Sequence, residues 1–137
     1  MFRLDQQEFI KYRVDFQNTL TNYAHEIVGE TMQADGEFDG DWDSLRDECR
    51  DQIWHAAERE CIYTADCYKV VQFFQQWDSC EIDDAEQTIE DRGGFFGVKT
   101  LDDMHIQLAY ALWEAHLEAA VSNRIDELQE RAEKEAA

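Results

Sequence analysis

Apolar residues recur along most of the chain at the three- and four-residue spacing of amphipathic helices. The first segment is typical, because Phe9, Phe16, Leu20 and Ile27 fall on one face of a helix. Similar patterns follow in the later segments. We predict helices over residues 5–32, 43–60, 64–77 and 84–91, and a long last helix that begins at residue 100.

Residues that favour helix ends agree with these boundaries. Asp43 is a suitable N-cap for the second predicted helix, and Thr64 is suitable for the third. Thr100 and Asp103 resemble a capping box in which Asp replaces Glu. The glycine-rich stretch 92–98 is the one segment that could hold extended structure.

The predicted fold is all-α, a compact bundle of about four to five helices with a long C-terminal helix. The helix over 64–77 is apolar nearly all round, so we expect it at the centre. Residues 129–137 are polar or alanine and should project or fray. A chain of 137 residues is long enough to bury one core, so residues 1–137 are treated as a single domain.

Composition favours an intracellular protein without disulfides. No run approaches eighteen apolar residues, so we expect no segment that spans a membrane. The first residues lack the apolar core of a secretory signal. We therefore expect a cytoplasmic location in a bacterial host cell. The cysteines should be reduced and mostly buried: Cys49, Cys61, Cys67 and Cys80.

Charge changes the picture more than any other property. The formal net charge is −20, and it is unevenly spread. Residues 29–52 and residues 78–103 each carry nine acidic against two basic side chains, a net charge of −7, whereas residues 53–77 carry −1. Such a field repels nucleic acid and anionic membranes and attracts basic surfaces. We therefore expect a basic protein as the partner, with no direct binding of nucleic acid or membrane.

The acidic segments could imitate the phosphates of DNA. Carboxylates three or four residues apart on a helix lie about 5–6 Å apart, and duplex DNA carries one charge per about 1.7 Å of axis. The alternative is an ordinary solvated acidic surface. One predicted row comprises Asp41, Asp43, Asp47, Glu48 and Asp51; a second comprises Asp83, Asp84, Glu86, Glu90 and Asp91, which Glu114, Glu118, Asp126, Glu127 and Glu130 could extend.

A candidate calcium loop lies between the first two predicted helices. Asp35, Glu37, Asp39 and Asp41 supply oxygen ligands at alternate positions, with glycine at the sixth position. The twelfth position should be a glutamate that binds calcium through both oxygens, but it is Arg46. An acidic turn followed by a helix cap is therefore the favoured interpretation.

No motif supports catalysis. The chain has no phosphate-binding loop, nucleophile elbow, zinc-protease helix or dinucleotide turn. Cys49, His55, Cys61 and Cys67 lie six residues apart, a spacing that does not suit zinc and favours buried thiols. We expect a binding protein that is not an enzyme and needs no cofactor.

Several stretches resemble phage antirestriction proteins of the Ocr group. They are Asp43-Ser-Leu-Arg-Asp-Glu-Cys-Arg-Asp-Gln-Ile-Trp-His-Ala-Ala-Glu, Ile62-Tyr-Thr-Ala-Asp66, and Leu112-Trp-Glu-Ala-His-Leu-Glu118 within a terminal acidic helix. The resemblance covers residues 41–77 and 100–131. It implies an acidic helical homodimer, shaped like DNA, that blocks the DNA channel of type I restriction–modification enzymes. It also implies that these residues replace phosphates: Asp43, Asp47, Asp51, Asp66, Glu114, Glu118, Asp126 and Glu127.

The chain also differs from that group. Residues 1–32 would be an added helix in front of a core over 41–131, Arg46, Arg50, Arg59 and Arg131 lie among the acids, and the tail ends in alanine. We predict a phage-type anti-defence protein that occupies the basic DNA channel of a type I restriction–modification enzyme or a CRISPR-type complex. The alternatives are a helical adaptor that binds through an apolar patch at Phe95 and Phe96, and a calcium-binding helix–loop–helix protein.

Overall fold

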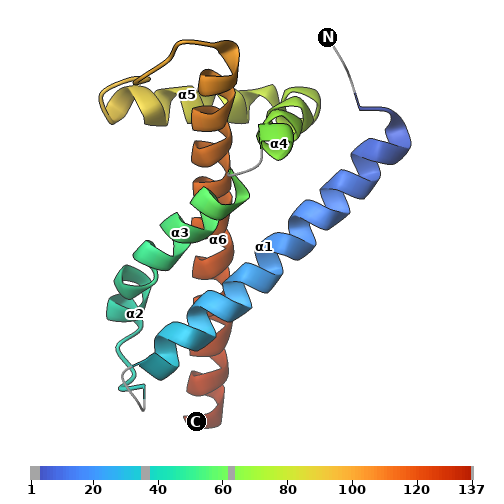
Figure 1. Cartoon of the computed structure of the whole chain (residues 1–137). Coiled ribbons are helices and arrows are strands. Elements are labelled where there is room, and N and C mark those ends of the chain that lie inside the picture. Colours follow the sequence, from blue (N-terminus) through green and yellow to red (C-terminus); the bar gives the residue numbers. More distant parts are fainter. Residues whose placement is uncertain (1–3, 35–37, 62–63, 137) are drawn as a thin grey trace.

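The chain folds as a helical bundle (Figure 1). The computed structural model describes residues 4–34, 38–61 and 64–136, without the side chains of residues 64–66 and 102. These ranges contain six helices and no strand, which confirms the predicted all-α class and the long C-terminal helix. The helices are α1 (Gln6–Ala34), α2 (Trp42–Glu48), α3 (Arg50–Glu60), α4 (Thr64–Trp77), α5 (Ser79–Asp91) and α6 (Leu101–Ala136).

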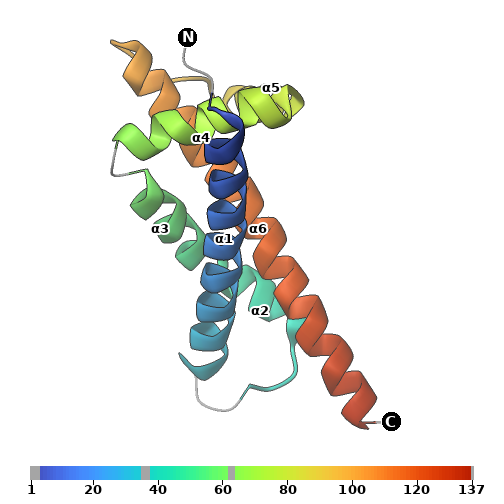
Figure 2. The same ribbon diagram turned by 90° about the vertical axis from the view of Figure 1, so that its right-hand side faces the viewer.

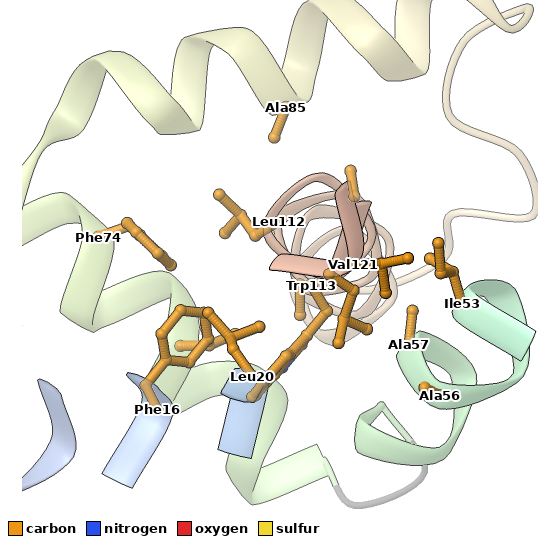
Figure 3. Close-up of a cluster of buried hydrophobic side chains, with 14 of the residues drawn as sticks. Phe16, Leu20, Ile53, Ala56, Ala57, Phe74, Ala85, Leu112, Trp113 and Val121 are labelled. Carbon is orange, nitrogen blue, oxygen red and sulfur yellow. The ribbon is translucent and has the colours of Figure 1, made fainter. Parts of the chain in front are cut away.

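The last helix is the centre of the bundle. Each of the other five helices contacts α6, and Figure 3 looks along it with α1, α3, α4 and α5 arranged around it. Its 36 residues give a length of about 54 Å, enough to meet every partner in turn. The expectation that α4 would be central is therefore wrong. Tyr68 and Trp77 leave α4 partly exposed, whereas α6 buries apolar residues on several sides.

Aromatic side chains join α1 to this centre. The ring of Phe16 lies 4.5 Å from the ring of Trp113 on α6 and 5.5 Å from the ring of Phe74 on α4, measured between centroids (Figure 3). Phe16 is only 3% exposed. Near the start of the described chain, Gln76 of α4 exchanges two 3.1 Å hydrogen bonds with the backbone of Leu4. Helix α1 therefore shares one core with the rest of the bundle.

Two helix starts differ from the sequence prediction. Asp41, not Asp43, is the N-cap of α2, because its carboxylate accepts a 3.1 Å hydrogen bond from the Ser44 N–H. Helix α5 begins at residue 79, five residues earlier than expected, where Asp78 caps it by accepting from the Cys80 N–H.

The predicted helix over 43–60 is divided into α2 and α3 at Cys49. Helical hydrogen bonds nevertheless continue through this point, since the Cys49 N–H donates to the Leu45 carbonyl and the Ile53 N–H to the Cys49 carbonyl. The side chain of Cys49 is fully buried. The division is therefore a slight bend, and α2 and α3 act as one rod.

The glycine-rich connection between α5 and α6 begins with a turn at Arg92 and Gly93 and forms no strand. Gly93 and Gly94 have φ angles of +109° and +90°, which favour glycine. The capping box is confirmed, because the Thr100 N–H donates to Asp103 and the Asp103 N–H donates to the Thr100 hydroxyl. Gln107 of α6 also holds the turn, since its amide exchanges hydrogen bonds of 2.8 and 3.3 Å with the backbone of Phe96.

The C-terminal part of α6 extends away from the bundle, as Figure 2 shows. The helix continues to Ala136, so the predicted projection is confirmed without fraying in the described part. Although α1 and α6 are long, neither they nor any other described helix has an apolar stretch that could cross a membrane.

Candidate partner-binding surface

The outer face of α5 is a dense group of carboxylates. Ile82, Ala85 and Ile89 turn inwards and fix which side of the helix faces the core. The acidic residues between them are consequently exposed, and none has a cation partner among the described residues. This α5 acidic face comprises Asp83, Asp84, Glu86, Glu90 and Asp91.

The rod of α2 and α3 carries a second row. Asp43, Asp47 and Asp51 follow one another at four-residue intervals and are all exposed. The nearest cation is Arg50, whose guanidinium lies 3.7 Å from Asp47 with both side chains about three-quarters exposed, a geometry that contributes little. Glu48 is exposed too and accepts a 3.3 Å hydrogen bond from the Ser44 hydroxyl. The predicted first row therefore exists as an exposed acidic edge.

Most of the predicted acids of α6 form ion pairs with arginines of the same chain. Asp126 pairs with Arg46 of α2, and Glu127 lies 3.2 Å from Arg124 one turn before it. Glu114 pairs with Arg92, leaving its side chain 15% exposed. Three of the five acids predicted on this helix are thus paired with arginines within the chain. Glu118 and Glu130 are exposed and form no ion pair in the described structure, and the side chain of Asp66 on α4 lies outside the described residues.

The candidate calcium loop is described only in part. Asp35 and Glu37 lie outside the described residues. Asp39 accepts a 3.0 Å hydrogen bond from the Asp41 N–H, and Asp41 caps α2. These two carboxylates therefore shape the turn. Within the described ranges, no three His, Cys, Asp or Glu side chains gather in a way that could hold a metal ion.

Two cationic side chains of α1 and α4 lie over aromatic rings. Arg13 of α1 lies 5.0 Å from the centre of the Trp77 ring, and Lys69 of α4 lies 5.6 Å from that of Tyr12. Both contacts join α1 to α4.

A groove of about 910 Å³ lies between α3 and α6, and the C-terminal end of α5 and the turn after it also line it. In Figure 1, α3 and this end of α5 reach α6 from the same side. Ile53, Ile89 and Ile106 supply apolar lining. Trp54 and Phe96 stand at the groove while 60% and 80% exposed, an unusual exposure for large aromatic side chains.

Charged residues surround this apolar lining. Arg92 donates to both carboxylate oxygens of Glu114, a bidentate pair that ties α5 to α6. One turn further along α6, burial raises the pKa of Glu118, with the Glu114 charge as the second cause. Burial and the Glu114 charge likewise raise the pKa of Tyr110. The groove therefore contains one carboxylate, Glu118, that is partly buried and forms no ion pair in the described structure, although the charges of Arg92 and Arg50 act on it and partly offset the rise of its pKa.

Two further polar contacts fix the helices around this region. The Tyr23 hydroxyl of α1 donates a 2.6 Å hydrogen bond to Glu60 of α3, and burial together with Glu60 raises the pKa of Tyr23 to about 12. On the other side, Nε2 of His116 lies 2.6 Å from a carboxylate oxygen of Glu81. Glu60 and Glu81 do not belong to the predicted acidic rows, so these contacts leave the carboxylates of the rows exposed.

Sequence reasoning found the acidic rows but missed the groove. It identified Phe95 and Phe96 as a candidate apolar patch; the structure exposes Phe96, whereas Phe95 packs partly against the core. The overlooked residue is Trp54, whose signal was a tryptophan on the polar side of α3, one position away from the buried Ile53.

No protein-family model, no curated protein and no solved structure matches this chain.

Proposed function

We propose that the chain is an anti-defence inhibitor that imitates DNA and occupies the basic DNA-binding channel of a nucleic-acid-handling enzyme. The candidate targets are type I restriction–modification enzymes and CRISPR-type complexes of a bacterial host. The α5 acidic face carries this proposal, because it presents five exposed carboxylates without a cation partner in the described structure. Surfaces that serve solubility alone usually intersperse both signs of charge.

The spacing of the second row supports the same function. Four residues advance a helix by about 6 Å, so Asp43, Asp47 and Asp51 place charges at regular intervals along one rod. Phosphates on one DNA strand advance by about 3.4 Å along the axis. The negative charges on this rod are more widely spaced than the phosphates of DNA, but they also follow one another at a regular interval. A regular row of negative charge suits long-range attraction to a basic channel. The resemblance to Ocr-group proteins points in the same direction.

The ion pairs within the chain change which acids should matter. Glu114, Asp126 and Glu127 already interact with arginines, so their charges are partly compensated before any partner arrives. We therefore assign the main role to the α5 acidic face and to the row on α2 and α3. The α6 acids contribute less than the resemblance implies.

The experiment is affinity capture from bacterial lysate with the immobilised full chain, eluted by NaCl from about 50 mM to about 500 mM. The proposal expects DNA-handling enzymes in the eluate, released as the salt concentration rises. Release by salt is expected because the contact rests on many charge pairs. Capture of a single protein that resists high salt, without any DNA-handling enzyme, would contradict it.

Grouped neutralisation sharpens this experiment. Asp83→Asn, Asp84→Asn, Glu86→Gln and Glu90→Gln together change the net charge from −20 to −16. The matched control makes the same change on α1 with Glu8→Gln, Asp15→Asn, Glu26→Gln and Glu30→Gln. The α5 variant should elute at lower salt than the control, whereas any single substitution should be nearly silent. Equal elution of the two variants would mean that only total charge matters.

A further inference from the structure

The groove between α3 and α6 has the features of a binding site that the acidic rows do not use. Its volume of about 910 Å³ and its apolar lining distinguish it from the exposed, charged face of α5. Ile53 of α3 and Ile106 of α6 lie on its two sides. Concave, mainly apolar sites with a few polar groups are the usual form of specific recognition sites.

Two aromatic side chains stand exposed at this groove. Trp54 belongs to α3, and Phe96 belongs to the turn before α6, so they approach the groove from different elements. Gln107 fixes the backbone of Phe96 through two hydrogen bonds, which holds this side chain at the surface. Exposed and positioned aromatic residues are the type that most often dominates the binding energy of an interface.

Three glutamates and two arginines line the groove, so its formal charge is negative: Glu58, Glu114, Glu118, Arg50 and Arg92. Arg92 is engaged with Glu114, and Arg50 forms only a weak, exposed pair with Asp47. Glu118 is partly exposed and forms no ion pair in the described structure, although the charges of Arg92 and Arg50 act on it. A ligand that fits this groove should therefore be mostly apolar and carry one cation near Glu118.

We propose that this groove binds an amphipathic helix of a partner protein, with a lysine or arginine of that helix paired with Glu118. The described elements around the groove are helices and a turn, so no strand edge is available to an extended peptide. An extended peptide would leave backbone groups without partners, whereas a helix satisfies its own backbone. The proposal does not depend on DNA mimicry, because the α5 acidic face is not part of the groove.

The test is selection of displayed peptides against the full chain. The library consists of helical peptides of about eighteen residues, with apolar residues at the spacing of one helical face and one randomised position between them. Enriched peptides should carry lysine or arginine at the randomised position. Absence of enrichment over the display carrier would overturn the proposal.

Substitutions in the groove locate the binding. Trp54→Ser and Phe96→Ser should each weaken binding of an enriched peptide by about tenfold or more. Both side chains are mostly exposed, so the fold should tolerate these changes. The matched controls are Ile10→Ser and Val14→Ser on α1. These changes also remove exposed apolar side chains, but neither residue lines the groove. Equal binding to groove and control variants would contradict the proposed site.

Charge reversal tests the role of Glu118. A second selection against the Glu118→Lys variant should favour aspartate or glutamate at the randomised position. Non-specific adhesion to exposed aromatic residues would not reverse this preference. An unchanged preference for lysine or arginine would therefore remove Glu118 from the proposal.

Sedimentation of the chain alone tests the competing occupant. A dimer that Phe96→Ser dissociates would mean that a second copy fills the groove, and this result would overturn the partner-helix proposal. A failure here is distinguishable from a failure of DNA mimicry, because the α5 variant with four neutralised acids should bind an enriched peptide as well as the unmodified chain does. Weaker binding by that variant would show that the peptide uses the acidic face instead.

Discussion

Arg92, the C-cap residue of α5, donates hydrogen bonds to both carboxylate oxygens of Glu114 on α6. Glu114 is well shielded, with a side chain 15% exposed, whereas Arg92 is 55% exposed. The pair fastens α5 across the central helix next to the groove. Because of this pair, Glu114 is not one of the exposed carboxylates, although the sequence suggests it as a substitute for a phosphate.

Replacing Arg92 by glutamine should destabilise the fold by about 1–2 kcal/mol, because a shielded carboxylate would lose its partner. The measurement is urea-induced unfolding followed by tryptophan fluorescence. The double variant Arg92→Gln/Glu114→Gln should recover part of the loss, since no unpaired charge remains. If the double variant is less stable than the single one, the loss of stability does not come from an unpaired Glu114 carboxylate.

Phe16→Ala should cost about 3–5 kcal/mol, the range for truncating a buried aromatic side chain. The reason is the loss of contacts with Trp113 and Phe74, which join α1 to the rest of the core. The exposed Ile10 on the same helix offers a control, because Ile10→Ala should change stability little. Thermal unfolding of both variants compares them directly. A small effect of Phe16→Ala would mean that α1 is not an integral part of the core.

The raised pKa of Glu118 makes a prediction about pH. Its charged form is disfavoured in the folded state by burial and by Glu114, so it lowers stability at neutral pH. Glu118→Gln should therefore raise the free energy of unfolding at pH 7. The gain should shrink as the pH falls through the raised pKa towards the ordinary value of 4.5, because the wild-type carboxyl then becomes neutral as well.

A control is needed because removing any acid relieves repulsion in a chain of net charge −20. Glu130→Gln removes a carboxylate from an exposed position of the same helix. Unfolding curves measured at several pH values should show a larger gain for Glu118→Gln than for Glu130→Gln at pH 7. Identical gains at every pH would show general repulsion and no local effect.

The thiols should differ in their rates of alkylation. Burial raises the pKa of Cys49, and a hydrogen bond with Cys67, followed by burial, raises the pKa of Cys61. Cys80 is exposed at the start of α5. Because thiolates react and thiols do not, iodoacetamide should modify Cys80 about tenfold faster than the others. Mass spectrometry of the folded chain measures this order, and uniform modification would contradict the described burial.

The sequence predicts the helices well because its apolar residues are regularly spaced. Helix α4 and the capping box of α6 match the prediction closely, since Val70, Phe74 and Thr100 leave few alternatives. The start of α2 differs because Asp41, two residues before Asp43, is an equally suitable cap residue and accepts the capping hydrogen bond from Ser44. The central role of α6 was not predictable either, because it depends on which helices surround it.

The sequence predicts which acidic residues lie on exposed helical faces, but it does not predict which of them form ion pairs. Local sequence places Asp84 and Glu90 on an exposed helical face, and the structure agrees. The pairs of Arg46 with Asp126 and of Arg92 with Glu114 join residues far apart in the chain, so no local pattern indicates them. The groove needs α3, α5 and α6 together, which explains why Trp54 was not recognised.

The most direct test of the account is displacement of labelled duplex DNA from a purified DNA-handling enzyme that the chain captures. Fluorescence anisotropy of the DNA would be followed as each variant is added at low salt. The unmodified chain and the control neutralised on α1 should displace the duplex at similar concentrations, whereas the variant with four acids removed from α5 should need about tenfold more. Binding of the enzyme without any displacement of DNA, or equal displacement by both variants, would contradict the claim that these carboxylates replace phosphates.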